Sequence, residues 1–286
     1  MKLFSPFTLN LRGRLYEVNR PQVMGIVNAT PDSFYSGSRT MVADDIRRRV
    51  EQMIVDGVDM IDVGAYSSRP GADVVSPDEE MRRLDVALGV IGELKGDIPV
   101  SVDTFRAGVA RRCVLELGAD IINDISGGTL DPDMFAAVAD LHAPYILMHM
   151  RGNPSTMQSL CDYDEGVTYG VIKELSGKVA ALEEAGVADI IIDPGFGFSK
   201  TLEQNYQLAA GLPFIIEAFR KPVLVGISRK SMLTRLLGIS PAEALEATVA
   251  LDMALMSLGA AIVRVHDVKA ARQSVTIAAQ LAKFTD

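Results

Sequence analysis

The sequence of 286 residues lacks the features that mark several common classes of protein. It has only two cysteines, Cys113 and Cys161, and their spacing matches neither a C-x-x-C motif nor a metal site. A disulfide framework and a cysteine metal centre are therefore excluded. We expect Cys113 to be buried in a helix, since free cysteines are among the most buried residues, and we predict a reducing, cytoplasmic setting.

Long apolar runs are also missing. The most apolar long segment, residues 247–263, is interrupted by Asp252 and ended by Gly259. It is shorter than the ~20 residues that a membrane-spanning helix needs. No uninterrupted apolar stretch follows Lys2, so we expect no signal peptide and no membrane partner.

Positive charge is in deficit. Lysine and arginine number 28 against 37 aspartates and glutamates, which gives a net charge of −9. Nucleic-acid binders usually carry a basic patch, so we predict no nucleic-acid partner. An anionic small molecule is still compatible with this balance, because a cleft acts locally and a metal ion can neutralise phosphate charge.

What the sequence does contain is a repeating pattern of short apolar runs separated by stretches with helical spacing. The runs lie at 23–28, 60–64, 99–104, 120–125, 145–150, 189–195, 223–228 and 262–267. Continuous Val/Ile-rich runs are typical of strands buried on both faces. Eight such strand–helix units predict an α/β fold, a closed (β/α)8 TIM barrel, in a single domain over residues 1–286.

A short β-hairpin is predicted in residues 1–21, before the barrel of residues 22–286. Polar and apolar residues alternate on both sides of Gly13. We expect this hairpin to plug the amino-terminal end of the barrel. Helix starts are predicted at Ser76-Pro77 and Ser240-Pro241, where a capping side chain precedes a proline.

Polar side chains stand where the predicted strands end, which is where such barrels hold their chemistry. Asp103, Asn123 and Asp193 supply two carboxylates and an amide, which suit a heterocycle with several N–H donors. For any one of them alone, a structural role at the strand end is an equal alternative. His149 is open between the pocket and the core.

A second group of residues suits an anion. Strand alternation places Arg264 and His266 on the same side, and Lys230 follows the seventh strand. Barrels often bind phosphate with the loops after strands seven and eight, so these residues predict an anion clamp. The amide oxygen of Asn28 suits a hard cation such as Mg²⁺. Arg69, beside Pro70, suits a carboxylate or phosphate, the alternative being a surface arginine in a turn.

Several segments together resemble the dihydropteroate synthase family. They are MGIVNATPDSF (24–34), IDVGAYSSRPGA (61–72), SVDTFR (101–106), IINDISGG (121–128), LMHMRGNPSTMQ (147–158), DPGFGFSK (193–200), GISRKS (226–231) and RVHD (264–267). The resemblance implies condensation of 6-hydroxymethyl-7,8-dihydropterin pyrophosphate with p-aminobenzoate to 7,8-dihydropteroate and pyrophosphate, a step of folate biosynthesis that sulfonamides compete for.

The resemblance also implies roles for individual residues. The pterin is expected to be held by Asp103, Asn123, Asp193 and Lys230, with Met148 packed nearby. Pyrophosphate is expected at Asn28, Arg264 and His266, with Asn28 also on Mg²⁺, and p-aminobenzoate at Ser68, Arg69, Pro70, Phe198 and Ser231. The expected catalytic set is Asp103, Lys230, Arg264 and His266. The family is usually a homodimer through its last helices, which fits the apolar segment 241–258.

The sequence departs from the family pattern beside the p-aminobenzoate segment. Ala65 and Tyr66 stand where a glycine and a glutamate are frequent, and Ser68 replaces a frequent threonine.

The sequence leaves three alternatives to this reaction. A pterin-dependent methyltransferase barrel would lack Arg69-Pro70 and the RVHD ending, and a non-catalytic paralogue has no need of an intact site. A Schiff-base aldolase would need a buried Lys230 with a depressed pKa, which its place in a loop beside Arg229 disfavours.

Overall fold

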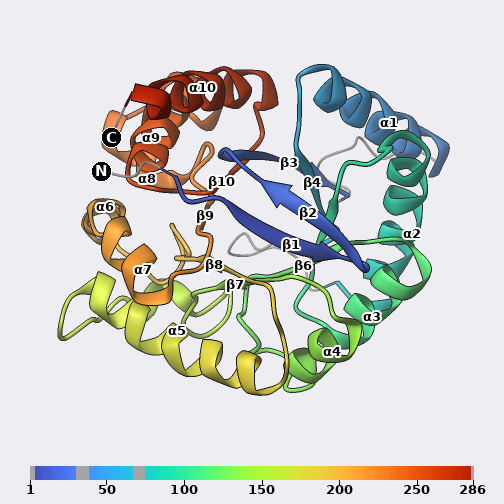
Figure 1. Cartoon of the computed structure of the whole chain (residues 1–286), viewed down its shortest axis with the longest axis horizontal. Coiled ribbons are helices and arrows are strands. Elements are labelled where there is room, and N and C mark those ends of the chain that lie inside the picture. The colour runs from blue at the N-terminus through green and yellow to red at the C-terminus, as the bar shows by residue number, and fades with distance from the viewer. Residues whose placement is uncertain (1–3, 30–38, 67–74, 285–286) are drawn as a thin grey trace.

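The computed structural model describes residues 4–29, 39–66 and 75–284, and its centre is a barrel of parallel strands (Figure 1). The barrel strands are β3 (Gln22–Asn28), β4 (Met60–Gly64), β5 (Val100–Asp103), β6 (Ile121–Asp124), β7 (Tyr145–Met148), β8 (Ile190–Asp193), β9 (Leu224–Val225) and β10 (Ile262–Val265). Their order is β8-β7-β6-β5-β4-β3-β10-β9, and a bridge between Ile192 and Val223 joins the two ends. The predicted (β/α)8 barrel is confirmed.

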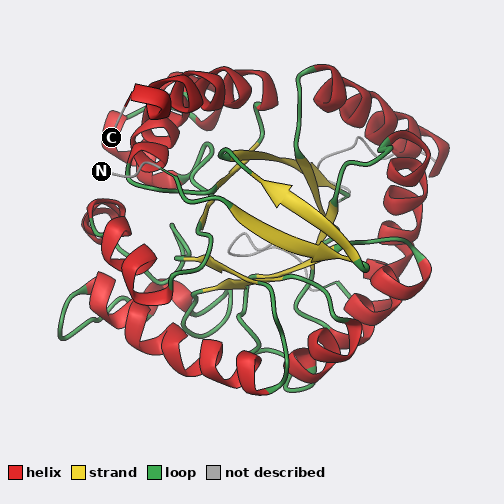
Figure 2. Cartoon of the chain, in the orientation of Figure 1, coloured by secondary structure: helices red, strands yellow, loops and turns green. Residues whose placement is uncertain are grey.

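Helices surround the barrel on its outside (Figure 2). They are α1 (Arg39–Val55), α2 (Pro77–Leu94), α3 (Ala107–Glu116), α4 (Met134–Leu141), α5 (Val167–Glu184), α6 (Leu202–Ala210), α7 (Leu212–Phe219), α8 (Ser231–Leu237), α9 (Leu245–Ser257) and α10 (Val268–Leu281). Short 3₁₀ turns occupy η2 (Met157–Ser159), η3 (Pro241–Glu243) and η4 (Ala282–Phe284). The main core lies between the outer faces of the strands and these helices.

The predicted hairpin closes one end of the barrel. Strands β1 (Phe7–Leu11) and β2 (Arg14–Val18) pair antiparallel, and Arg12 and Gly13 form the turn with positive φ angles of 54° and 83°. Figure 1 shows this hairpin lying across the barrel opening that faces the viewer. Its inward side chains join a buried cluster with the first residues of the barrel strands, including Leu9, Leu11, Met24, Met60, Ile121, Ile146, Ile191 and Ile262. The expectation of a plug is confirmed.

Helix boundaries follow the predicted signals at one of the two serine–proline sites. Ser76 caps α2 by accepting a hydrogen bond from the backbone of Glu79. At Ser240, in contrast, the capping box with Glu243 closes only the single turn η3, and α9 begins later, at Leu245. The expected helix start there was therefore four residues early. No helix in the described part of the chain is long and apolar enough to cross a membrane.

Candidate active site at the carboxyl ends of the strands

A hub of four polar side chains lies inside the mouth of the barrel. Nε of Arg264 donates to Oδ2 of Asp62 over 2.6 Å, and Nη2 of Arg264 donates to Oδ2 of Asp103 over 3.1 Å. The amide of Asn123 donates to the same Asp62 oxygen over 3.2 Å. Strands β4, β5, β6 and β10 are therefore tied together by side chains that converge on one arginine.

Asp62 was missed from the sequence. It is fully buried within β4, and its Oδ1 has no hydrogen-bond partner among the described residues. A lone carboxylate in the apolar run MIDVG was the available signal, because an unpaired buried charge is too costly to be incidental.

Burial sets the charge state of Asp103. It raises the pKa of Asp103 to about 7; Arg264 opposes the rise, while the carboxylate of Asp62 adds to it. Asp103 lies directly beside Asn123 in the register of β5 and β6, so the predicted convergence of these two residues is confirmed.

Asp193 and Lys230 both hydrogen-bond to the backbone of the loop that follows β8. Oδ1 of Asp193 accepts from the backbone N–H of Gly195 over 2.8 Å. Burial raises the pKa of Asp193, and the charge of Lys230 opposes the rise. Nζ of Lys230 donates to the carbonyl of Phe196 over 2.6 Å and lies 4.7 Å from the ring centroid of Phe198.

The expectation that Lys230 avoids burial was wrong. Burial lowers the pKa of Lys230 to about 8, and the carboxylate of Asp193 opposes this change. The chain turns at Arg229, whose φ is 56°, and the stem of Lys230 then lies against the loop, within 3.3 Å of a Cβ placed on Gly197. This reversal of direction carries no signature in the sequence.

Apolar side chains line the mouth beside these charges. Met148 is 3% exposed and packs with Ile125, Met150 and Met157, against which the half-buried rings of Phe105 and Phe198 lie. An apolar surface next to carboxylate, amide and ammonium groups suits a flat heterocycle with a polar edge. The structure thus places Met148, expected near the pterin, and Phe198, expected at the p-aminobenzoate site, in one apolar cluster.

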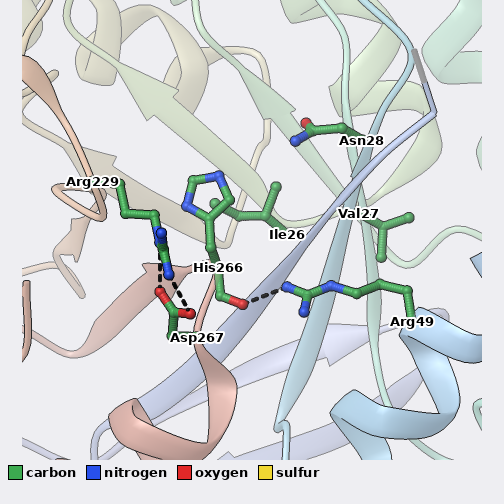
Figure 3. Close-up of a pocket in the computed structure, with 7 residues that line it drawn as sticks. All are labelled: Ile26, Val27, Asn28, Arg49, Arg229, His266 and Asp267. Carbon is green, nitrogen blue, oxygen red and sulfur yellow. Dashed lines mark hydrogen bonds and ion pairs between the residues drawn. The ribbon is translucent and has the colours of Figure 1, made fainter. Parts of the chain in front are cut away.

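A cavity of about 350 Å³ opens beside the hub, between β3 and the end of β10. Figure 3 shows its lining, in which Asn28 and the imidazole of His266 face the same space; the lining residues are Ile26, Val27, Asn28, Arg49, Arg229, His266 and Asp267. Burial lowers the pKa of His266 to about 4, and the charge of Arg264 lowers it further, so the ring is neutral near pH 7. The polar lining suits an anion.

Two arginines of this cavity were not among the predicted site residues. Arg229 forms a double salt bridge with Asp267, with both N–O distances 2.8 Å. Arg49, on α1, donates to the carbonyl of His266, and burial lowers its pKa. Arg49 belongs to a run of three arginines, and the sequence does not show which of them points at the barrel.

His149 belongs to a buried network and not to the cavity. Its Nδ1 lies 3.1 Å from Nζ of Lys200, and its Nε2 lies 3.0 Å from Oε2 of Glu174. Nζ of Lys200 also donates to the carbonyls of Gly195 and Phe198, both over 2.9 Å. Burial lowers the pKa of His149 to about 4 and that of Lys200 to about 7. The network holds the loop that follows Asp193 and carries Phe198.

The remaining predicted residues are placed as follows. Ser231 is exposed at the first position of α8, while Ser68, Arg69 and Pro70 lie outside the described residues. Within the described ranges no group of three or more His, Cys, Asp or Glu is arranged to hold a metal ion. Mg²⁺ usually keeps several waters and binds through one or two protein ligands plus substrate phosphates, so Asn28 beside an anion cavity fits such an ion.

Comparison with known proteins places the chain in a family. A family model described as pterin binding enzyme matches residues 24–266. A dihydropteroate synthase of Synechocystis is 44% identical over 264 residues, covering 91% of this chain and 89% of the relative. Two solved structures are similar along their whole length.

The first is Yersinia pestis dihydropteroate synthase in complex with a sulfonamide drug. It is 37% identical with a TM-score of 0.87, covering 97% of this chain and 100% of that one. The second is the Xanthomonas albilineans enzyme with 4-aminobenzoic acid, which is 35% identical with a TM-score of 0.88, covering 99% of this chain and 100% of that one. The chain belongs to the pterin binding enzymes and, within them, to the dihydropteroate synthase family.

Proposed function

We propose that the chain condenses 6-hydroxymethyl-7,8-dihydropterin pyrophosphate with p-aminobenzoate, giving 7,8-dihydropteroate and pyrophosphate. One observation carries this assignment: a hub of carboxylate, amide and guanidinium groups, flanked by an apolar cluster, lies next to a cavity lined by two arginines and a histidine. The relatives named above as dihydropteroate synthases support the same reaction. The two adjoining sites match the two halves of a pterin pyrophosphate.

The pterin ring belongs over the hub. Carboxylates of Asp103 and Asp193 accept from the N–H groups of the ring, and Asn123 and Lys230 meet its acceptors. Met148 supplies an apolar face against the ring. Since Arg264 contacts Asp103 directly, the hub holds the carboxylate of Asp103 in a fixed direction before the substrate arrives.

Pyrophosphate belongs in the adjoining cavity. The Nε2 side of His266, the guanidinium of Arg264 and the amide of Asn28 stabilise the negative charge that grows as the C–O bond breaks. Asn28 would also hold Mg²⁺ carried by the substrate, and the ion would supply further neutralisation of the phosphate charge.

The second substrate attacks the methylene carbon from which pyrophosphate departs. The amine nitrogen of p-aminobenzoate forms a C–N bond with its lone pair, the C–O bond pair leaves with pyrophosphate, and the amine then loses one proton. An aniline nitrogen is mostly unprotonated near neutral pH, so much of the acceleration comes from positioning. Phe198 and Ser231, with Ser68, Arg69 and Pro70 beyond the described residues, form the proposed p-aminobenzoate site.

The test is pyrophosphate release by the purified protein given the dihydropterin pyrophosphate and Mg²⁺, with and without p-aminobenzoate. Release that depends on p-aminobenzoate and yields dihydropteroate supports the proposal. Pterin binding without product would favour the non-catalytic paralogue or the methyltransferase. The cationic cavity argues against the methyltransferase, which has no pyrophosphate to bind.

The aldolase alternative is revised by the structure. Lys230 is more buried than expected, which removes the first argument against it. Its Nζ nevertheless donates to the carbonyl of Phe196, and the charge of Asp193 opposes the lowering of its pKa. Both interactions favour an ammonium over a free amine. Borohydride reduction in the presence of a carbonyl compound checks this point, and labelling of Lys230 would contradict our assignment.

We also propose that the chain forms a homodimer through its last helices. Large apolar side chains are exposed there at Leu236, Leu237, Ile277, Leu281 and Phe284. Ile277 and Leu281 lie on α10 and Phe284 follows in η4, and α10 packs against both α9 and η4, so these three residues belong to one region of the surface. Light scattering after size-exclusion chromatography tests the proposal: a mass of twice 30.8 kDa supports it, and a mass of one chain contradicts it.

A further inference from the structure

Ser228 makes two contacts with a single residue of the anion cavity. It follows β9 and is 6% exposed. Its Oγ lies 3.2 Å from the backbone nitrogen of His266 and 3.0 Å from Nδ1 of the same residue. A backbone N–H only donates, so the hydroxyl oxygen accepts the first of these bonds.

The hydroxyl proton decides the second bond. If Nδ1 carried the ring proton, Oγ would accept twice, and its own proton would have no acceptor among the described residues. If Nε2 carries the ring proton, the hydroxyl donates to Nδ1, and the one donor left without a described partner, Nε2–H, belongs to a ring that lines the cavity. Buried polar groups are overwhelmingly paired, so the second arrangement is the one that the contacts select.

His149 is also the Nε2–H tautomer, but its Nε2–H is hydrogen-bonded within the protein. Lys200 donates to Nδ1 of His149, so Nε2 carries the proton and donates to Glu174. That proton is fully used inside the protein. Nε2 of His266, in contrast, has no partner within the described residues, and its ring lines the cavity with Asn28 (Figure 3).

We propose that Ser228 is a positioning residue that fixes His266 as its Nε2–H tautomer and thereby presents one neutral N–H donor to the anion in the cavity. The inference rests on the proposed function and adds a cause to it. The carbonyl of His266 is held by Arg49, so the backbone N–H, the carbonyl and Nδ1 of one residue are all fixed. A donor held in this way needs neither ring rotation nor proton uptake when pyrophosphate binds.

The ring state is measured directly by ¹⁵N NMR of protein labelled at histidine. The chain has three histidines, so the spectrum is simple, and His266→Asn and His149→Gln assign two of them. We expect Nε2 of His266 to be protonated and Nδ1 to be unprotonated in the wild-type protein. A spectrum with the proton on Nδ1 would overturn the proposal without any variant.

The same samples are titrated with sodium pyrophosphate. Ser228→Ala removes the hydroxyl, so we expect a mixture of His266 tautomers. We also expect pyrophosphate to bind about five- to ten-fold more weakly, which corresponds to the free energy of about one hydrogen bond. Ser228→Thr keeps a hydroxyl and should restore both properties. Ser274→Ala is the matched control, because Ser274 is equally buried and its hydroxyl only donates to Ala270 within α10.

The outcomes separate the two proposals. An Nε2–H ring in a protein that fails to bind pyrophosphate leaves the tautomer assignment standing and contradicts the proposed function. Pyrophosphate binding with the proton on Nδ1, or an unchanged tautomer and affinity in Ser228→Ala, overturns the role of Ser228 and leaves the proposed function standing.

Discussion

Asp62 and Arg264 lie 202 positions apart in the chain, yet Nε of Arg264 donates to Oδ2 of Asp62 over 2.6 Å. The pair joins β4 to β10 across the mouth of the barrel, and the same guanidinium reaches Asp103. A fully buried carboxylate therefore directs the arginine that we assign to pyrophosphate. Removal of the Asp62 carboxylate should lower both the stability and the activity of the protein.

Asp62→Asn should lower the free energy of unfolding by about 3 kcal/mol, because it breaks a buried ion pair and leaves Arg264 with only one of its two carboxylate partners. Urea denaturation at pH 7 measures the change. Asp97→Asn is the control, since Asp97 pairs with Arg14 where both side chains are exposed, and the expected effect there is within about 0.5 kcal/mol. Equal effects of the two substitutions would contradict a structural role for Asp62.

The pH dependence of stability should carry a contribution from His149. Burial lowers its pKa to about 4 from 6.5, so the folded ring stays neutral where the unfolded ring already takes up a proton. Stability from this group is therefore complete above pH 6.5 and is lost as the pH falls toward 4. Urea midpoints between pH 7 and pH 4.5 measure this loss, which we expect to be about 1–2 kcal/mol at pH 5.

His149→Gln tests the assignment of that slope. A glutamine can accept from Lys200 and donate to Glu174, so the network is kept while the titrating group is removed. We expect a flatter dependence on pH over the same range. An unchanged slope would assign the effect to other groups.

Lys200→Met should disturb the p-aminobenzoate site without touching it. Nζ of Lys200 holds the carbonyls of Gly195 and Phe198, so its loss frees the loop that carries Phe198. We expect the KM for p-aminobenzoate to rise about ten-fold, since small displacements of positioning groups are costly. Lys178→Met is the control, because Lys178 is a half-buried lysine whose Nζ donates to a carbonyl elsewhere, at Ser126. If both variants changed KM alike, the loop would not be the cause.

Gly195→Ala should be among the most damaging single substitutions in the described chain. A Cβ at Gly195 would lie 1.9 Å from the carbonyl oxygen of His149, and φ is 71°. Gly166 has a φ of 87° with nothing within 4 Å of its Cβ, so it isolates the backbone strain. We expect about 1 kcal/mol for Gly166→Ala and at least ~3 kcal/mol for Gly195→Ala, measured by thermal or urea unfolding. Similar losses would mean that the loop can move away from β7.

The sequence carried the architecture because strand burial on both faces leaves a visible pattern. The runs around Val102, Ile122 and Ile191 are apolar for that reason, and each became a barrel strand. Their polar ends then placed Asp103, Asn123 and Asp193 at one mouth. The motifs that contain these strand ends identified the family. The roles of single residues stay predictions.

What escaped prediction depended on directions that no local pattern encodes. The carboxylate of Asp62 stands out within its apolar run, but its partner Arg264 comes from the far end of the chain, and no local pattern pairs the two. The burial of Lys230 follows from a left-handed turn at Arg229. Arg49 is distinguished from Arg47 and Arg48 only by which side of α1 meets the barrel.

The hairpin at the other end of the barrel limits how ligands enter and leave. Leu9 and Leu11 close the amino-terminal end of the barrel, so the described part of the barrel is open only at the carboxyl ends of its strands. Any ligand bound inside the barrel must enter and leave through this one opening. Of two molecules stacked along that axis, the inner one has to arrive first.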